Sequence, residues 1–114
     1  MRITLCFLAV CFSSNVLAQV AGPDWSALEE ETLKHFRALL QFDTSDPPGG
    51  ELPAAEYLYN VLQAEGIDVE MLATDSERPN VLARIEGNGS KQPLLIMAHT
   101  DVVNVDPEKW QFPP

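Results

Sequence analysis

The sequence predicts an α/β fold whose open sheet is incomplete, with two helices followed by three strands. Two stretches of apolar residues at near-helical spacing come first, and three short strand-like runs come after them. In a chain of 114 residues, this order leaves too few elements to cover both faces of a sheet. We therefore expect the front portion of a larger α/β domain.

The first 18 residues have the pattern of a secretory signal peptide. A positive start precedes the almost wholly apolar residues 3–12, and cleavage is expected after Ala18. The apolar run is shorter than the roughly 20 residues that a membrane-spanning helix needs. A buried N-terminal strand or helix and a lipoprotein with its lipidation box at residues 8–11 stay open as alternatives. The signal pattern predicts a secreted or periplasmic protein whose domain occupies residues 19–114.

Charge and cysteine content restrict the chemistry of residues 19–114. The whole chain has 17 Asp and Glu against 7 Lys and Arg, a net charge of −10. This acidity argues against nucleic acid as a partner and, once the signal is removed, against anionic membranes, because both need a cationic face. Both cysteines, Cys6 and Cys11, lie in the signal. Any metal site in the remaining chain must therefore use His and carboxylate ligands.

The first helix is predicted from about residue 24 to 41. Apolar side chains recur there on one face, and Asp24 or Ser26 can cap the start. Glu29, Glu30 and Glu31 fall in the first turns, where negative charge suits the helix dipole. The pattern indicates an amphipathic helix with a solvated acidic side.

A loop and a second helix are predicted next. Residues 43–50 are rich in Asp, Ser, Pro and Gly, which is typical of turns. Asp43 and Asp46 flank this turn, and we expect both to bond to the backbone. An apolar stripe over residues 51–65 predicts the second helix, with Gly66 ending it as a left-handed cap.

Three strands are predicted in the second half of the chain. Residues 67–73 and 80–86 alternate between apolar and polar side chains, as half-buried strands do. Residues 86–90 contain two glycines and are expected to form a turn. Residues 93–98 are almost continuously apolar, which predicts a central strand buried on both faces.

Polar residues directly follow this third predicted strand, at the edge where open α/β sheets bind ligands. His99 and Asp101 are two residues apart, so in an extended chain they point to the same side. A neutral imidazole can bind Zn²⁺ through one nitrogen and donate its other N–H to a carboxylate. On spacing alone, a surface or hydrogen-bonded histidine remains the more common outcome.

Several segments strengthen the interpretation of His99 and Asp101 as part of a metal site. They are His-Thr-Asp-Val-Val at 99–103, Asp-Pro-Glu-Lys-Trp at 106–110, Phe-Pro-Pro at 112–114, the loop at 42–51 and Arg-Pro-Asn-Val at 78–81. In this order the chain resembles the zinc-dependent exopeptidase and amidohydrolase family of glutamate carboxypeptidase, aminoacylase, acetylornithine deacetylase and succinyl-diaminopimelate desuccinylase. The resemblance covers residues 24–114. Asn104 departs from it, because the family usually has a proline there.

The resemblance implies that residues 19–114 are the N-terminal part of a zinc-peptidase catalytic domain. His99 would be a ligand of one of two Zn²⁺ ions, with other divalent metals open, and Asp101 the catalytic-site residue that orients His99. The other ligands, the general-base Glu and a dimerisation or lid domain would lie beyond residue 114. A homodimer of the full-length protein stays open.

The implied reaction of the full-length protein is hydrolysis of an amide or peptide bond. Small peptides or N-acyl amino acids are the expected substrates, and export favours a carboxypeptidase-like or dipeptidase-like metallopeptidase. Two alternatives stay open for the 114 residues themselves. One is a truncated, catalytically inactive chain, and the other is a small periplasmic binding module that uses the acidic surface.

Overall fold

A computed structural model describes residues 22–112, so the predicted signal peptide and its cleavage after Ala18 lie outside the described residues. The elements in chain order are α1 (Trp25–Leu39), β1 (Ser45–Asp46), α2 (Leu52–Ala64), β2 (Asp68–Leu72), β3 (Asn80–Arg84), β4 (Val102–Val103) and the 3₁₀ turn η1 (Pro107–Lys109). Two helices and two small sheets confirm the predicted α/β class. Within residues 22–112, neither helix has the length and apolar content that a membrane crossing requires.

Helix α1 begins where the sequence predicts and lies beside α2. Asp24 is the cap, because its Oδ1 accepts hydrogen bonds from the backbone N–H of Ser26 at 3.1 Å and of Ala27 at 3.2 Å. The side chain of His35 reaches α2, and its Nδ1 lies 2.7 Å from the hydroxyl of Tyr57. Much of the apolar face of α1 stays in solvent, including Phe36 at 56% exposure.

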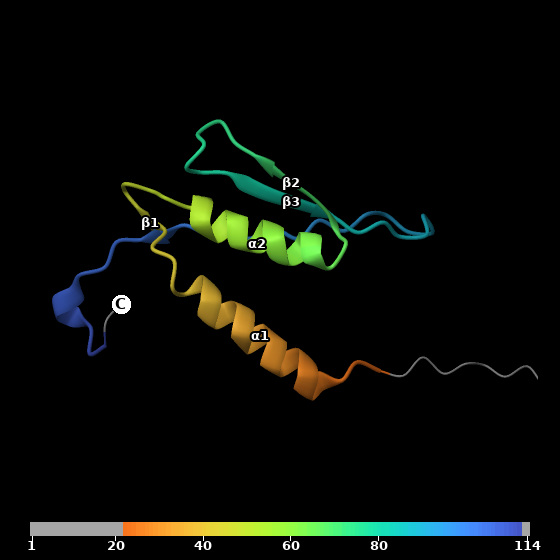
Figure 1. Cartoon of the computed structure of the whole chain (residues 1–114), viewed down its shortest axis with the longest axis horizontal. Helices are drawn as coiled ribbons and strands as arrows, with labels where there is room; N and C mark the ends of the chain where they lie inside the picture. The colour runs from red at the N-terminus through yellow and green to blue at the C-terminus, as the bar shows by residue number, and fades with distance from the viewer. Residues whose placement is uncertain (1–21, 113–114) are drawn as a thin grey trace, which may run out of the picture.

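Helix α2 lies between α1 and the β2–β3 hairpin (Figure 1). Its end at Gly66 is left-handed as predicted, with φ of +72°. Strands β2 and β3 pair antiparallel from Asp68 opposite Arg84 to Leu72 opposite Asn80. This confirms the first two predicted strands to within two residues at each end. The buried apolar residues among those described are the alanines 54 and 55 of α2.

A second, parallel sheet joins the loop after α1 to the end of the chain. Ser45 pairs with Val102 and Asp46 with Val103. The sequence predicted only a loop at residues 43–50, because two-residue strands leave no alternation to detect. This pairing brings the first loop against the segment that holds His99 and Asp101 (Figure 1).

The predicted third strand, residues 93–98, is wrong. These residues have no strand partner within residues 22–112, and their side chains are exposed, with Leu94 at 84% and Ile96 at 83%. A strand exists through hydrogen bonds to a neighbour, and apolar composition predicts burial without supplying that neighbour. In place of one three-stranded open sheet, the described residues form two separate two-stranded sheets.

Candidate metal site and its supporting loop

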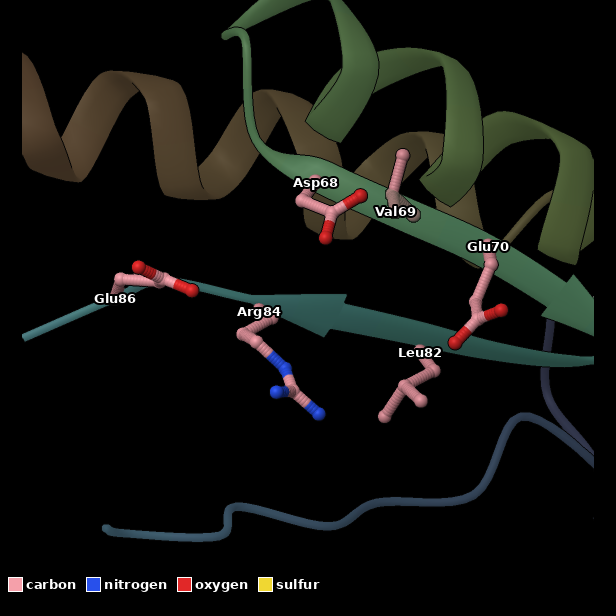
Figure 2. A pocket seen from close by; sticks show the side chains of 6 residues that line it. All are labelled: Asp68, Val69, Glu70, Leu82, Arg84 and Glu86. Atoms are coloured by element: carbon pink, nitrogen blue, oxygen red, sulfur yellow. The ribbon is translucent and has the colours of Figure 1, made fainter.

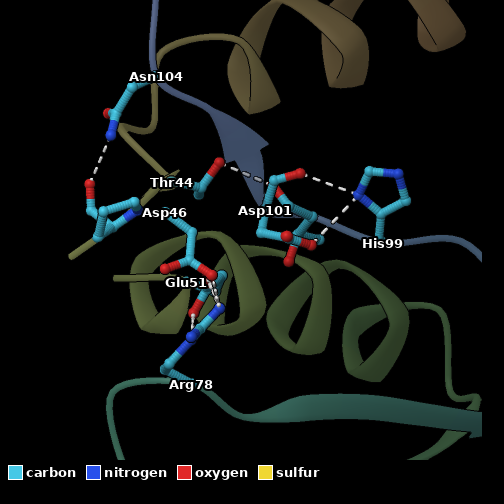
Figure 3. A network of polar contacts seen from close by, with 9 residues as sticks. Thr44, Asp46, Glu51, Arg78, His99, Asp101 and Asn104 are labelled. Atoms are coloured by element: carbon cyan, nitrogen blue, oxygen red, sulfur yellow. Dashed lines mark hydrogen bonds and ion pairs between the residues drawn. The ribbon is translucent and has the colours of Figure 1, made fainter. Parts of the chain in front are cut away.

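His99 and Asp101, the two residues predicted to form the site, do lie together. The Nδ1 atom of His99 is 2.9 Å from the backbone oxygen of Asp101 and 3.2 Å from its Oδ1 (Figure 3). Both oxygens only accept hydrogen bonds, so Nδ1 of the neutral ring carries the hydrogen and Nε2 keeps a free lone pair. The His99 side chain is 83% exposed, which leaves Nε2 accessible. A ring held at Nδ1 with Nε2 free is the arrangement in which a histidine can bind a metal.

Thr44 holds the backbone on both sides of Asp101. Its hydroxyl donates to the oxygen of Thr100 at 2.7 Å, and its own backbone oxygen accepts from the N–H of Val102 at 3.0 Å. Thr44 is only 4% exposed, whereas most of the described chain is open to solvent. The first loop therefore positions the segment that carries the candidate site.

The loop itself is closed by local hydrogen bonds. Oδ1 of Asp43 accepts from the backbone N–H of Ser45 at 3.1 Å and from its hydroxyl at 2.7 Å. These bonds, the hydroxyl first, lower the pKa of Asp43 below its ordinary value. The prediction that Asp43 bonds to the backbone of its turn is confirmed. For Asp46 the same prediction is wrong, because its carboxylate pairs with Arg78 at 3.0 Å.

Arg78 anchors the loop from the hairpin side. Its Nε and Nη2 each donate to one oxygen of Glu51 at 2.9 Å, and Nη2 also donates to Asp46 (Figure 3). This two-pronged contact is the strong geometry of an arginine–carboxylate pair. The hydrogen bonds from Arg78 hold the pKa of Glu51 below its ordinary value against the opposing effect of burial, and they raise the pKa of Arg78.

Asn104 adds a further link between the two segments. Its side-chain Nδ2 donates to the backbone oxygen of Pro47 at 2.8 Å (Figure 3). Asn104 occupies the position where the resemblance leads one to expect proline, and a proline could not make this bond. Asn104 thus lacks the rigid ring of the expected proline and instead makes a hydrogen bond to the loop at Pro47.

Sequence reasoning missed the supporting residues Thr44, Glu51 and Arg78. Arg78 was noted only as a member of the matching segment 78–81, and Glu51 only as the end of the matching loop 42–51 and the start of the second predicted helix. They lie 27 residues apart, and nothing in the sequence marks them as partners. A buried threonine in a polar loop also has no signature of its own.

The described residues include a shallow hollow on the β2–β3 hairpin, which does not include His99 or Asp101. It is lined by Asp68, Val69, Glu70, Leu82, Arg84 and Glu86. Figure 2 shows Val69 pointing to the helix side of the hairpin, while the charged side chains point away from it. Within residues 22–112 there is no group of three His, Cys, Asp or Glu residues that could hold a metal. The described residues therefore offer a partial site centred on His99.

The chain is similar in sequence to hydrolases. It is 31% identical over 90 residues to the N-formyl-4-amino-5-aminomethyl-2-methylpyrimidine deformylase of Halalkalibacterium halodurans, covering 75% of this chain and 21% of that enzyme. It is also 31% identical over 88 residues to a probable succinyl-diaminopimelate desuccinylase of Staphylococcus epidermidis, covering 75% of this chain and 20% of the relative. The chain thus spans about a fifth of the length of the curated relatives it matches. No protein-family model and no solved structure matches it.

Proposed function

We propose that the whole protein is a metal-dependent hydrolase of the zinc exopeptidase and amidohydrolase family. One observation carries this proposal: both hydrogen-bond acceptors at Nδ1 of His99 come from Asp101, which leaves Nε2 free. The similarity to a desuccinylase, one of the enzymes that the sequence motifs resemble, supports it.

The residues present fit one metal ligand and its orienting partner. His99 would hold Zn²⁺ through Nε2, and Asp101 would fix the ring and make it a better donor. A zinc ion, when bound, polarises the scissile carbonyl and makes water a stronger nucleophile at neutral pH. Because residues 22–112 contain no group of three potential ligands, the remaining ligands would have to come from outside them. The family resemblance would place the general-base Glu outside them as well.

The substrates proposed are small peptides or N-acyl amino acids, cleaved at an amide bond. The names of the relatives support this class, since a deformylase and a desuccinylase each remove an acyl group. Carboxypeptidase-like or dipeptidase-like activity fits a protein exported by the pattern of its first 18 residues. Secretion or periplasmic location is part of the proposal.

Metal analysis of the full-length protein tests this function. We expect stoichiometric zinc in the wild type and loss of that zinc in His99→Ala, with hydrolysis of a dipeptide and N-acyl amino acid panel falling more than 100-fold. That loss should exceed the about 10–100-fold that removing a supporting residue costs, which is the effect expected for Asp101→Ala. His35→Ala is the matched control, because His35 bonds to Tyr57 in the helix pair. A His99→Ala protein that keeps wild-type zinc would refute the assignment.

The alternative for the 114-residue chain by itself is that it has no catalytic activity. The partial site around His99 favours this alternative, because residues 22–112 hold no complete ligand group. Zinc titration and a hydrolysis assay of the 114-residue chain test it. We expect weak zinc binding and no turnover, and measurable turnover by this chain would exclude the inactive alternative.

A further inference from the structure

The peptide groups on both sides of Asp101 are held by one residue of the first loop. The peptide between Thr100 and Asp101 presents its oxygen to the hydroxyl of Thr44 at 2.7 Å. The peptide between Asp101 and Val102 presents its N–H to the backbone oxygen of Thr44 at 3.0 Å. Two bonds on either side of one Cα restrict both backbone torsions of Asp101.

The same geometry fixes the acceptors that face His99. A trans peptide points its N–H and its C=O in opposite directions, so the N–H of Val102 aimed at Thr44 turns the oxygen of Asp101 away from Thr44. That oxygen lies 2.9 Å from Nδ1 of His99. The Asp101 carboxylate, 3.2 Å from the same nitrogen, is carried on the same restricted backbone.

Thr44 can act in this way because its loop is anchored elsewhere. Arg78 holds Glu51 and Asp46 at 2.9 to 3.0 Å, and the backbone N–H of Leu52 donates to the oxygen of Glu77 at 2.9 Å. Thr44 is 4% exposed, so water competes poorly for its hydroxyl. A buried hydroxyl is thus connected to the exposed His99 ring through the backbone of Thr100 and Asp101.

We propose that Thr44 is a positioning residue, which sets the tautomer and direction of the His99 ring by fixing both peptide groups of Asp101. The proposal deepens the proposed function and rests on it for its catalytic meaning. The positioning itself concerns the metal-free protein and can be measured there.

The test uses the full-length protein with three single substitutions. Thr44→Val removes the hydroxyl at nearly constant shape, and Thr44→Ser keeps the hydroxyl. Thr32→Val is the matched control, because the Thr32 hydroxyl donates to the backbone oxygen of Leu28 at 2.6 Å on the exposed side of α1. The ¹⁵N shifts of the His99 ring in the metal-free protein at mildly alkaline pH report the tautomer, and chelator competition reports zinc affinity.

We expect the Nδ1–H tautomer to predominate in the wild type, in Thr44→Ser and in Thr32→Val. Thr44→Val should reduce that preference and weaken zinc binding about tenfold, the lower end of the effect of losing a residue that supports a metal ligand. The visible spectrum of the cobalt-substituted protein should change in Thr44→Val alone.

Each other outcome is decisive. An unchanged His99 tautomer in folded Thr44→Val overturns the positioning role. If Thr44→Val does not fold, loss of the tautomer preference in Thr44→Ser overturns it as well, since the hydroxyl is still present there. A wild type that binds no zinc, but whose tautomer responds to Thr44→Val, supports the positioning role and overturns the proposed function.

Discussion

Replacing Gly49 with alanine should be unusually costly, for two separable reasons. Gly49 has φ of +80°, in the left-handed region that costs a residue with a side chain about 1–2 kcal/mol. A Cβ at this position would also lie 2.9 Å from Nε and 3.1 Å from Cζ of Arg78. Arg78 cannot move aside without losing its bonds to Glu51 and Asp46.

The expected magnitude follows from adding a steric effect to the backbone strain. Overpacking typically costs about 1–3 kcal/mol, so Gly49→Ala should lower the free energy of unfolding by about 2–5 kcal/mol in total. Gly89→Ala isolates the strain, because Gly89 has φ of +74° and a Cβ at this position would have no neighbouring atom within 4 Å. Gly89→Ala should lower the free energy of unfolding by only about 1–2 kcal/mol.

Urea unfolding of the wild type and both variants, followed by circular dichroism, measures the difference. Equal losses in Gly49→Ala and Gly89→Ala would refute the reasoning, because Arg78 would then be free to move. A double variant gives an independent check. In an Arg78→Ala background, Gly49→Ala should lose the steric part of its cost and retain the strain.

Two further predictions concern acid stability and helix capping. Because the folded-state pKa of Glu51 is below its ordinary value of 4.5, its stabilising effect is present above pH 4.5 and is lost as the pH falls through the lower folded value. The melting temperature of Glu51→Gln should therefore fall less steeply in acid than that of the wild type, and parallel curves would contradict this. Asp24→Ala removes the acceptor for two backbone N–H groups and should cost about 1 kcal/mol, seen as a lower melting temperature and weaker helical dichroism.

Local patterns were enough to predict the helices and the hairpin. The stripes of α1 and α2, the cap at Asp24 and the left-handed Gly66 all follow from interactions within a few residues. Both β2 and β3 contact α2, and their half-buried residues are Val69 and Val81, which belong to the predicted alternation. The predicted ends of these helices and strands differ from the observed ends by no more than two residues.

Strand pairs and hydrogen bonds between residues far apart in the sequence could not be predicted. The apolar run at 93–98 indicated burial, but no pattern within it says which strand would pair with it. The reverse holds for Ser45 and Val102, which pair although their local sequence indicates a loop. His99 and Asp101 were singled out by their spacing together with the matching segments around them, whereas Thr44 is linked to them only through the fold.

The pairing of β1 with β4 also bears on the order of folding events. The hydrogen bond from Thr44 to Thr100 closes a loop across 56 positions, whereas α2, β2 and β3 are neighbours along the chain. Closing a long loop loses more chain entropy than joining adjacent elements, so the helix–hairpin unit should form first. The candidate site would then assemble late, and substitutions at Thr44 should mainly speed unfolding while leaving the folding rate nearly unchanged.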